Sequence, residues 1–256
     1  MAQDVTQIAG PLLGGSFVAF FGFPGAYGLI VAANVANVVL TLVARSPVIS
    51  AHDRTVSVWK DLRQGLGHIR KNRSAQGILL LAAVANFVGF TYGQTLLPVV
   101  ARDVFKTGPM GLGLLMTALG VGALIASLAV ASQHNLAGKG VVMLASFLAW
   151  PLLLALLAVS PWYAVFFVIL LVIGAVQSLA MTTTTSLLLT CIPEEMKGRV
   201  MGVRALMIGT LPLGNLMAGA AASFFGTRVA TEANAAIMGA AVLAIIFTYR
   251  GLRTLE

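Results

Sequence analysis

The chain consists of long apolar stretches separated by short turns and by one long polar loop. Eight stretches are long enough to cross a bilayer, whose ~30 Å core needs roughly 20 apolar residues in a helix. The polar loop at residues 45–74 follows the second stretch and precedes the other six. We place the spans at residues 3–22, 25–44, 75–99, 110–131, 140–159, 162–185, 200–222 and 232–249.

These stretches are continuously apolar, which favours helices over barrel strands, where lipid-facing and inward-facing residues alternate over about ten residues. The predicted fold class is therefore all-α and polytopic. Residues 1–44 supply two helices, 75–249 form a six-helix bundle and 250–256 form a tail. The composition agrees, because 59% of the 256 residues are hydrophobic and 9% are charged, whereas about a quarter of a soluble domain is charged.

Lysine and arginine are distributed unevenly between the two sides of this arrangement. Of the 16 such residues, 13 fall in the long loop, in alternate later loops and in the tail, while Arg102, Lys106 and Arg228 fall on the other side. Cytoplasmic loops collect positive charge. We therefore expect a multi-pass protein of the plasma membrane, which is the inner membrane in a cell with two membranes. The long loop and both termini should be cytoplasmic.

The net charge of +8 has the same explanation and does not call for a nucleic-acid partner. The single cysteine, Cys191, excludes an internal disulfide and a cysteine metal cluster. We expect no resident metal or cofactor. The bilayer itself is the first partner that the composition implies.

Within the long loop, Trp59, Leu62, Leu66 and Ile69 recur at helical spacing. This pattern predicts a short amphipathic helix on the inner membrane surface. A regulatory or partner-binding segment is the alternative.

The first span carries the segment Gly10-Pro11-Leu12-Leu13-Gly14-Gly15. Gly10 and Gly14 stand about one turn apart and allow another helix to approach closely. Pro11 removes a backbone donor and loosens the helix. Ordinary small-residue packing explains the segment equally well on physical grounds.

Polar residues inside the later spans are candidates for a solute cavity, because a bilayer penalises them. Asn86 and Gln94 share one face of the third span, Gln177 lies in the sixth, and Asn215 lies in the seventh. The alternative for each is a hydrogen bond between helices, which stabilises by only about 0.6–2 kcal/mol.

The start of the seventh span holds charged residues that are candidates for a cytoplasmic gate: Glu194, Glu195, Arg199 and Arg204. Pro193 followed by two acids also fits a helix start, where the dipole favours negative charge. Arg204 lies about a turn inside the span, and snorkelling to lipid headgroups is its alternative role. The sequence lacks a GxxxxGK[ST] phosphate loop and a hydrolase motif, so we expect neither ATP-driven transport nor an enzyme.

The glycine-rich segment at residues 10–15 and the turn at 21–25 resemble the fifth helix of the major facilitator superfamily, in which the segment is the antiporter motif. Residues 193–202 resemble the loop before helix eleven in the bacterial efflux branch that includes siderophore and macrolide exporters. The chain then corresponds to helices five to twelve. The resemblance implies small-molecule export by alternating access, with a substrate cavity between the halves.

The resemblance also implies a missing N-terminal segment of four helices, so we expect a truncated transporter. A non-transporting membrane remnant or assembly partner is the alternative. Proton coupling is common in the family, but Thr6 replaces a motif glycine and no carboxylate lies deep in a span. The residues of this chain therefore do not support it.

Overall fold

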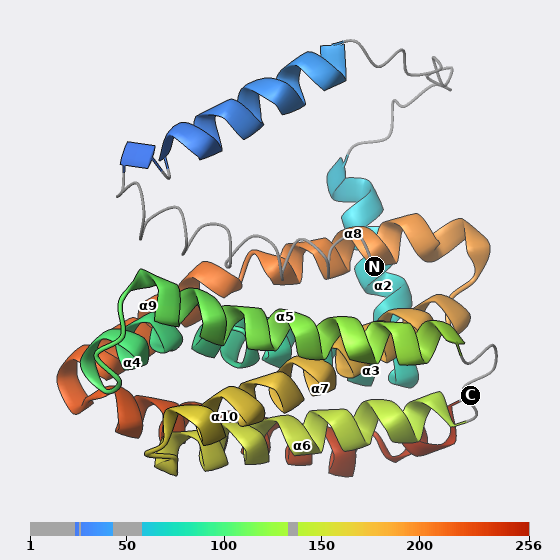
Figure 1. Cartoon of the computed structure of the whole chain (residues 1–256). Coiled ribbons are helices and arrows are strands. Elements are labelled where there is room, and N and C mark those ends of the chain that lie inside the picture. The colour runs from blue at the N-terminus through green and yellow to red at the C-terminus, as the bar shows by residue number, and fades with distance from the viewer. Residues whose placement is uncertain (1–23, 26, 43–57, 133–137, 256) are drawn as a thin grey trace.

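The computed structural model describes residues 24–25, 27–42, 58–132 and 138–255, and its regular elements are all helices. Six helical segments are long and apolar enough to cross a membrane (Figure 1). They confirm the all-α, polytopic class. The six are Arg73–Asp103 (α3, η1, η2 and α4), Pro109–Ser132 (α5), Lys139–Val159 (α6), Tyr163–Thr190 (α7), Glu194–Phe225 (α8 and α9) and Thr227–Thr248 (α10).

Local signals explain where these helices begin and end. The Asn72 side chain accepts a hydrogen bond from the Ala75 amide at 3.1 Å and caps α3. Pro193 precedes α8, whose first turn carries Glu194 and Glu195. Gly226, with φ of 84°, makes the turn between α9 and α10 that an L side chain rarely adopts.

Hydrogen bonds identify which helix ends lie together. The Asn72 amide group donates to the Cys191 carbonyl oxygen at 3.0 Å, which joins the start of α3 to the end of α7. At the opposite end of the bundle, the Tyr163 hydroxyl donates to the Gly111 carbonyl oxygen at 2.9 Å. The six segments therefore alternate in direction, as the spacing of the apolar stretches predicts.

This alternation separates the charges whose side chains the structure places. Arg102, Lys106 and Arg228 lie at the Tyr163 end of the bundle. The other end carries Arg70, Lys71, Arg73, Lys139, Lys197, Arg199, Arg250 and Arg253. The grouping on which the predicted orientation depends is thus present in the fold, although the side of the membrane stays a prediction.

Glycines set the closest helix contacts. A methyl group added at Gly122 on α5 would overlap the Leu171 carbonyl of α7, and one at Gly174 would overlap the Leu119 carbonyl of α5. A methyl group at Gly214 on α9 would likewise overlap the Phe87 carbonyl of η1. Small residues of this kind let helix backbones touch within a membrane, where dispersion replaces the hydrophobic effect as the source of attraction.

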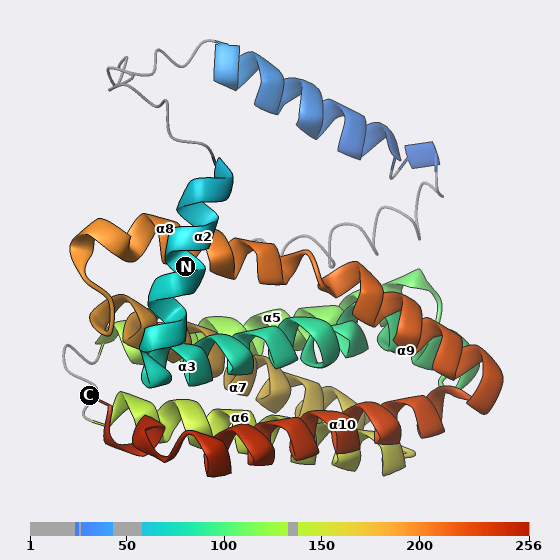
Figure 2. The same ribbon diagram turned by 180° about the vertical axis from the view of Figure 1, so that it is seen from behind.

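Two of the six segments are irregular. The first contains two π-helical stretches, η1 (Ala85–Gly89) and η2 (Tyr92–Leu96), between α3 (Arg73–Val84) and α4 (Leu97–Asp103). The fifth starts six residues before the predicted span at 200–222 and divides into α8 (Glu194–Ile208) and α9 (Leu211–Phe225). Pro212 in the first turn of α9 has no amide to donate to the Ile208 carbonyl, which explains the division. In Figure 2, α9 slopes away from the line of α8.

The amphipathic helix predicted in the long loop is α2, Val58–Lys71. Its residue Ile69 is buried and Leu62 packs against the core, whereas Trp59 is 80% exposed. Gly65 lies against the Arg199 carbonyl, so α2 crosses α8 closely (Figure 2). Part of the apolar face that we assigned to the membrane surface is therefore covered by the bundle itself.

The predicted span at 25–44 corresponds to a shorter apolar helix, Tyr27–Leu42. It lies apart from the six-helix bundle in both views (Figures 1 and 2), and every residue in it is exposed. The predicted span at 3–22 lies outside the described residues.

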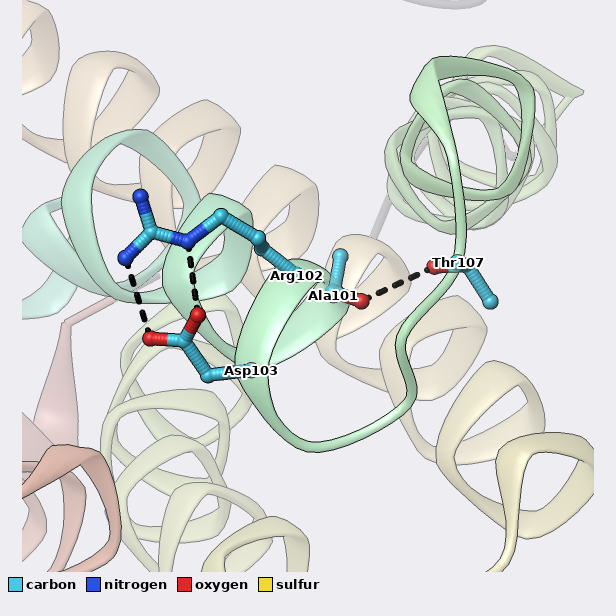
Figure 3. A network of polar contacts seen from close by, with 4 residues as sticks. All are labelled: Ala101, Arg102, Asp103 and Thr107. Atoms are coloured by element: carbon cyan, nitrogen blue, oxygen red, sulfur yellow. Dashed lines mark hydrogen bonds and ion pairs between the residues drawn. The ribbon is translucent and has the colours of Figure 1, made fainter.

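The turn after α4 closes through local polar contacts (Figure 3). The Arg102 guanidinium binds both carboxylate oxygens of Asp103, at 2.6 and 3.1 Å. The Thr107 hydroxyl donates to the Ala101 carbonyl oxygen at 3.1 Å. Asp103 is thus tied to its neighbour at the end of a span and does not point into the bundle as a free acid.

Candidate functional site

A cavity of about 470 Å³ opens between the first, fourth and fifth spans of the bundle. Its size is in the range of small-molecule sites. It is lined by Asn86 and Phe90 of the first span, Ala123 of α5, Gln177, Ser178, Met181, Thr182 and Thr185 of α7, and Met201, Arg204, Ala205 and Ile208 of α8.

Asn86 and Gln177 reach this cavity at the same depth. Asn86 lies 13 residues after Arg73, where α3 begins, and Gln177 lies 13 residues before Thr190, where α7 ends. At a rise of 1.5 Å per residue, each is roughly 20 Å from its helix end. The hydrogen bond from Asn72 to Cys191 shows that these ends adjoin. The two amides therefore line the cavity at a similar depth along the helices, well away from the helix ends.

Several polar side chains of the lining lack a hydrogen bond to another helix in the described part of the chain. The Asn86 amide donates to the Ala82 carbonyl oxygen of its own helix at 2.8 Å, so it does not join two helices. In the part of the chain that the structure describes, the side chains of Gln177, Ser178 and Thr182 make no hydrogen bond. These groups are available to a polar solute.

Arg204 adds a positive charge to the same cavity. It lies near the end of α8 and is half-buried. Among the described residues its guanidinium has neither an ion pair nor a hydrogen bond. From the sequence we predicted that Arg204 belongs to a cytoplasmic gate. In the fold it lines the same cavity as Asn86 and Gln177.

Gln94 and Asn215, the other two predicted cavity residues, lie elsewhere. The Asn215 amide donates to the Gln94 side-chain oxygen at 2.9 Å, which joins α9 to η2. Neither residue lines the 470 Å³ cavity. The structure thus divides the four predicted residues into one pair that faces the cavity and one pair that bridges two helices.

The remaining predicted site residues are at the start of α8 or outside the described chain. Glu194 forms an ion pair with Lys197, and Glu195 is exposed. The Arg199 guanidinium contacts the Met196 sulfur at 3.5 Å. The antiporter-like residues Gly10, Pro11, Gly14 and Gly15 lie outside the described residues.

One residue that sequence reasoning missed binds the first span close to the cavity-lining residues Asn86 and Phe90. The Asn234 side chain of α10 donates to the Val88 carbonyl oxygen at 3.1 Å and to the Thr91 hydroxyl oxygen at 2.8 Å. Val88 belongs to the π-helical stretch η1, and Thr91 lies just before η2, so both acceptors are where the backbone pattern of the first span is disturbed. The sequence signal for this contact was Asn234 itself, a polar residue near the start of an apolar span.

In the described part of the chain, six apolar spans and a cavity with polar and charged lining define a polytopic membrane protein. The family profile described as transmembrane secretion effector matches residues 1–254. The chain therefore belongs to this family of major facilitator transporters, as the resemblance of its motifs indicates.

Similar proteins include an efflux pump, a transporter and an exporter. The chain is 24% identical to the multidrug efflux pump Tap of Mycolicibacterium fortuitum over 227 residues, 22% identical to the staphyloferrin A transporter of Staphylococcus aureus over 230, and 27% identical to the enterobactin exporter EntS of Escherichia coli over 237. Each match covers 87% of this chain and 55% or 56% of the relative. The chain thus spans little more than half the length of these relatives.

The named relatives are transporters and not enzymes. Within the described residues, no group of three or more histidine, cysteine or acidic side chains is placed to hold a metal ion.

Proposed function

We propose that this chain supplies the six-helix bundle of a secondary transporter that exports a small organic molecule by alternating access. The observation that carries the proposal is the meeting of Asn86, Gln177 and Arg204 in one cavity well inside the spans. In transporters of this kind the substrate binds near the bilayer midplane and the two halves rock around it. The names of the relatives, a multidrug efflux pump, a staphyloferrin A transporter and an enterobactin exporter, support export of an organic solute.

The proposal includes an orientation. The ends of the bundle that carry most of the arginine and lysine residues face the cytoplasm, because positive loops are retained there. Arg204 and Met201 are then nearer the cytoplasmic side than Ile208. A solute entering from the cytoplasm would pass the start of α8 before it reached Asn86 and Gln177.

The test is release of probes from proteoliposomes that contain the protein. Vesicles are loaded with ethidium, carboxyfluorescein or radiolabelled lactose, which are a cation, an anion and a neutral solute. We expect at least one probe to leave faster than from protein-free vesicles. Gln177→Leu should abolish the difference, while Gln64→Leu, at an exposed position of α2, should not.

Release equal to that from empty vesicles for all three probes, with the protein present and folded, would contradict export by this chain. That outcome would favour the alternative, a non-transporting membrane protein that acts as an assembly partner.

A further inference from the structure

We infer that the cavity recognises an amphipathic organic acid, whose anionic group binds Arg204. This inference rests on the proposed function, because it names the class of solute that the same cavity holds. It begins from the charge of the lining. Among the described residues that border the cavity, Arg204 is the one that carries a charge.

An intramembrane arginine is costly unless an acid or a polar group satisfies it. The acids whose side chains the structure places offer no such partner. Asp103, Glu194 and Glu232 are already paired, as the ion pairs Arg102–Asp103, Lys197–Glu194 and Arg228–Glu232.

Glu195, the remaining acid on α8, precedes Arg204 by nine residues, or about 14 Å along the helix. A carboxylate so far away does not neutralise the guanidinium. An anionic group within the cavity would do so, with two parallel hydrogen bonds to the planar guanidinium fork.

The rest of the lining describes the body of the solute. Phe90, Met181 and Ile208 provide apolar and aromatic surface beside the charge. Asn86 and Gln177 provide neutral amide groups in the same lining. A molecule that satisfies both has an apolar or aromatic body, a few hydrogen-bonding groups and one acidic group. An inorganic anion would leave the apolar side chains of the lining exposed to water. A neutral hydrocarbon would leave Arg204 without a counter-ion.

The anionic group has two physical sources, a solute acid or the phosphate of a lipid headgroup. We assign it to a solute, because the side chains of Gln177, Ser178 and Thr182 form no hydrogen bond with the described part of the protein and face the same space. Lipid tails would not satisfy those groups. The experiment separates the two sources.

The test compares three naphthalene probes that share one ring system: 2-naphthoate, 2-naphthamide and 2-naphthylmethylammonium. Binding to the purified 256-residue protein in maltoside micelles, which contain no phosphate, is followed by probe fluorescence. We expect naphthoate to bind at least about tenfold more tightly than the amide, since hydrogen bonds to charged groups contribute more than neutral ones. The ammonium probe should bind most weakly.

Variants identify the group responsible. Arg204→Gln should remove the preference for naphthoate and leave amide binding within about twofold, while Arg204→Lys should keep part of it because the charge remains. Arg63→Gln removes an exposed charge from α2, outside the cavity, and is the control. It should leave the preference unchanged. Because the amide probe is measured on every variant, a misfolded protein is recognised by loss of amide binding.

Each remaining outcome decides a specific point. Equal binding of naphthoate and amide to the natural protein would overturn the inference while leaving the exporter proposal intact. Short-chain phosphatidic acid is also tested as a competitor of naphthoate. If it binds more tightly than naphthoate, Arg204 is assigned to a lipid phosphate, and this result would also overturn the inference. Failure of all three probes to bind a folded protein would contradict the solute cavity on which both proposals depend.

Discussion

Asn215 and Gln94 are 121 positions apart in the chain, yet the Asn215 amide donates to the Gln94 side-chain oxygen at 2.9 Å. The pair joins α9 to the π-helical stretch η2 and keeps both side chains out of the lining of the 470 Å³ cavity. The Asn215 oxygen is buried without a hydrogen-bond partner in the described protein. Asn215 and Gln94 therefore hold two spans together, whereas Asn86 and Gln177 line the cavity.

This pairing predicts coupled effects on stability. Gln94→Leu and Asn215→Leu should each destabilise the protein by about 0.6–1.7 kcal/mol, the range for hydrogen bonds between membrane helices. The double variant should lose less than the sum, because the second change removes a group that has already lost its partner. Thermal unfolding in micelles measures all three. Strictly additive losses would show that the two side chains do not interact.

The glycine contacts between α5 and α7 predict a strong effect of a small change. Gly174→Ala places a methyl group on the Leu119 carbonyl, and the helices must separate to accept it. We expect a loss of about 1–3 kcal/mol, typical of overpacking. Gly198→Ala on α8 meets open space and is the control. It should be neutral or slightly stabilising, because alanine favours the helix. Equal stability of the two variants would contradict the close approach.

The bonds from Asn234 to the π-helical region predict a role in shaping the cavity wall. Asn234→Leu removes the donor to Val88 and Thr91, so a buried carbonyl and hydroxyl lose a partner. We expect destabilisation of about 1–3 kcal/mol together with weaker binding of the naphthoate probe. Thr248→Ala, which removes only an exposed bond within α10, is the control. A variant that loses neither stability nor binding would show that the π-helical shape is held by other contacts.

The segregation of charge predicts the topology. In a Cys191→Ser background, a cysteine at Val104, an exposed position at the end of α4, should react with an impermeant thiol reagent added outside intact cells. A cysteine at Gln64 on α2 should react only after the membrane is opened. The reverse pattern would overturn the orientation given by the distribution of arginine and lysine.

Cys191 itself predicts a dependence on pH. Burial raises the pKa of its thiol, and a hydrogen bond with Thr190 offsets part of this effect. Since the thiolate is the reactive form, alkylation of Cys191 in the purified protein should rise at a higher pH than alkylation of a cysteine at Val104 in the Cys191→Ser background. The comparison requires rate measurements between about pH 7 and 10. Coincident pH profiles would show that the Cys191 thiol is solvated like an exposed one.

Some features depend only on local pattern, and the sequence predicted them. The lengths of the apolar stretches predicted the six helical segments of the bundle, and the spacing of Trp59, Leu62, Leu66 and Ile69 predicted α2. The motif at 193–202 and the order of the spans predicted the family. These predictions succeed because the bilayer imposes one rule on each stretch, that its backbone bonds be satisfied within the helix.

Other features depend on which helices touch, and only the tertiary structure decided them. Asn86, Gln94, Gln177 and Asn215 are chemically alike, and helical periodicity alone does not tell which neighbour each will face. The fold brings Arg204 to Asn86 and Gln177, and it turns Asn215 towards Gln94. Close backbone contacts at glycines such as Gly122, Gly174 and Gly214 bring particular helix faces together. A span can be predicted from its own residues because it satisfies its own backbone, whereas a cavity is the space that several spans leave between them.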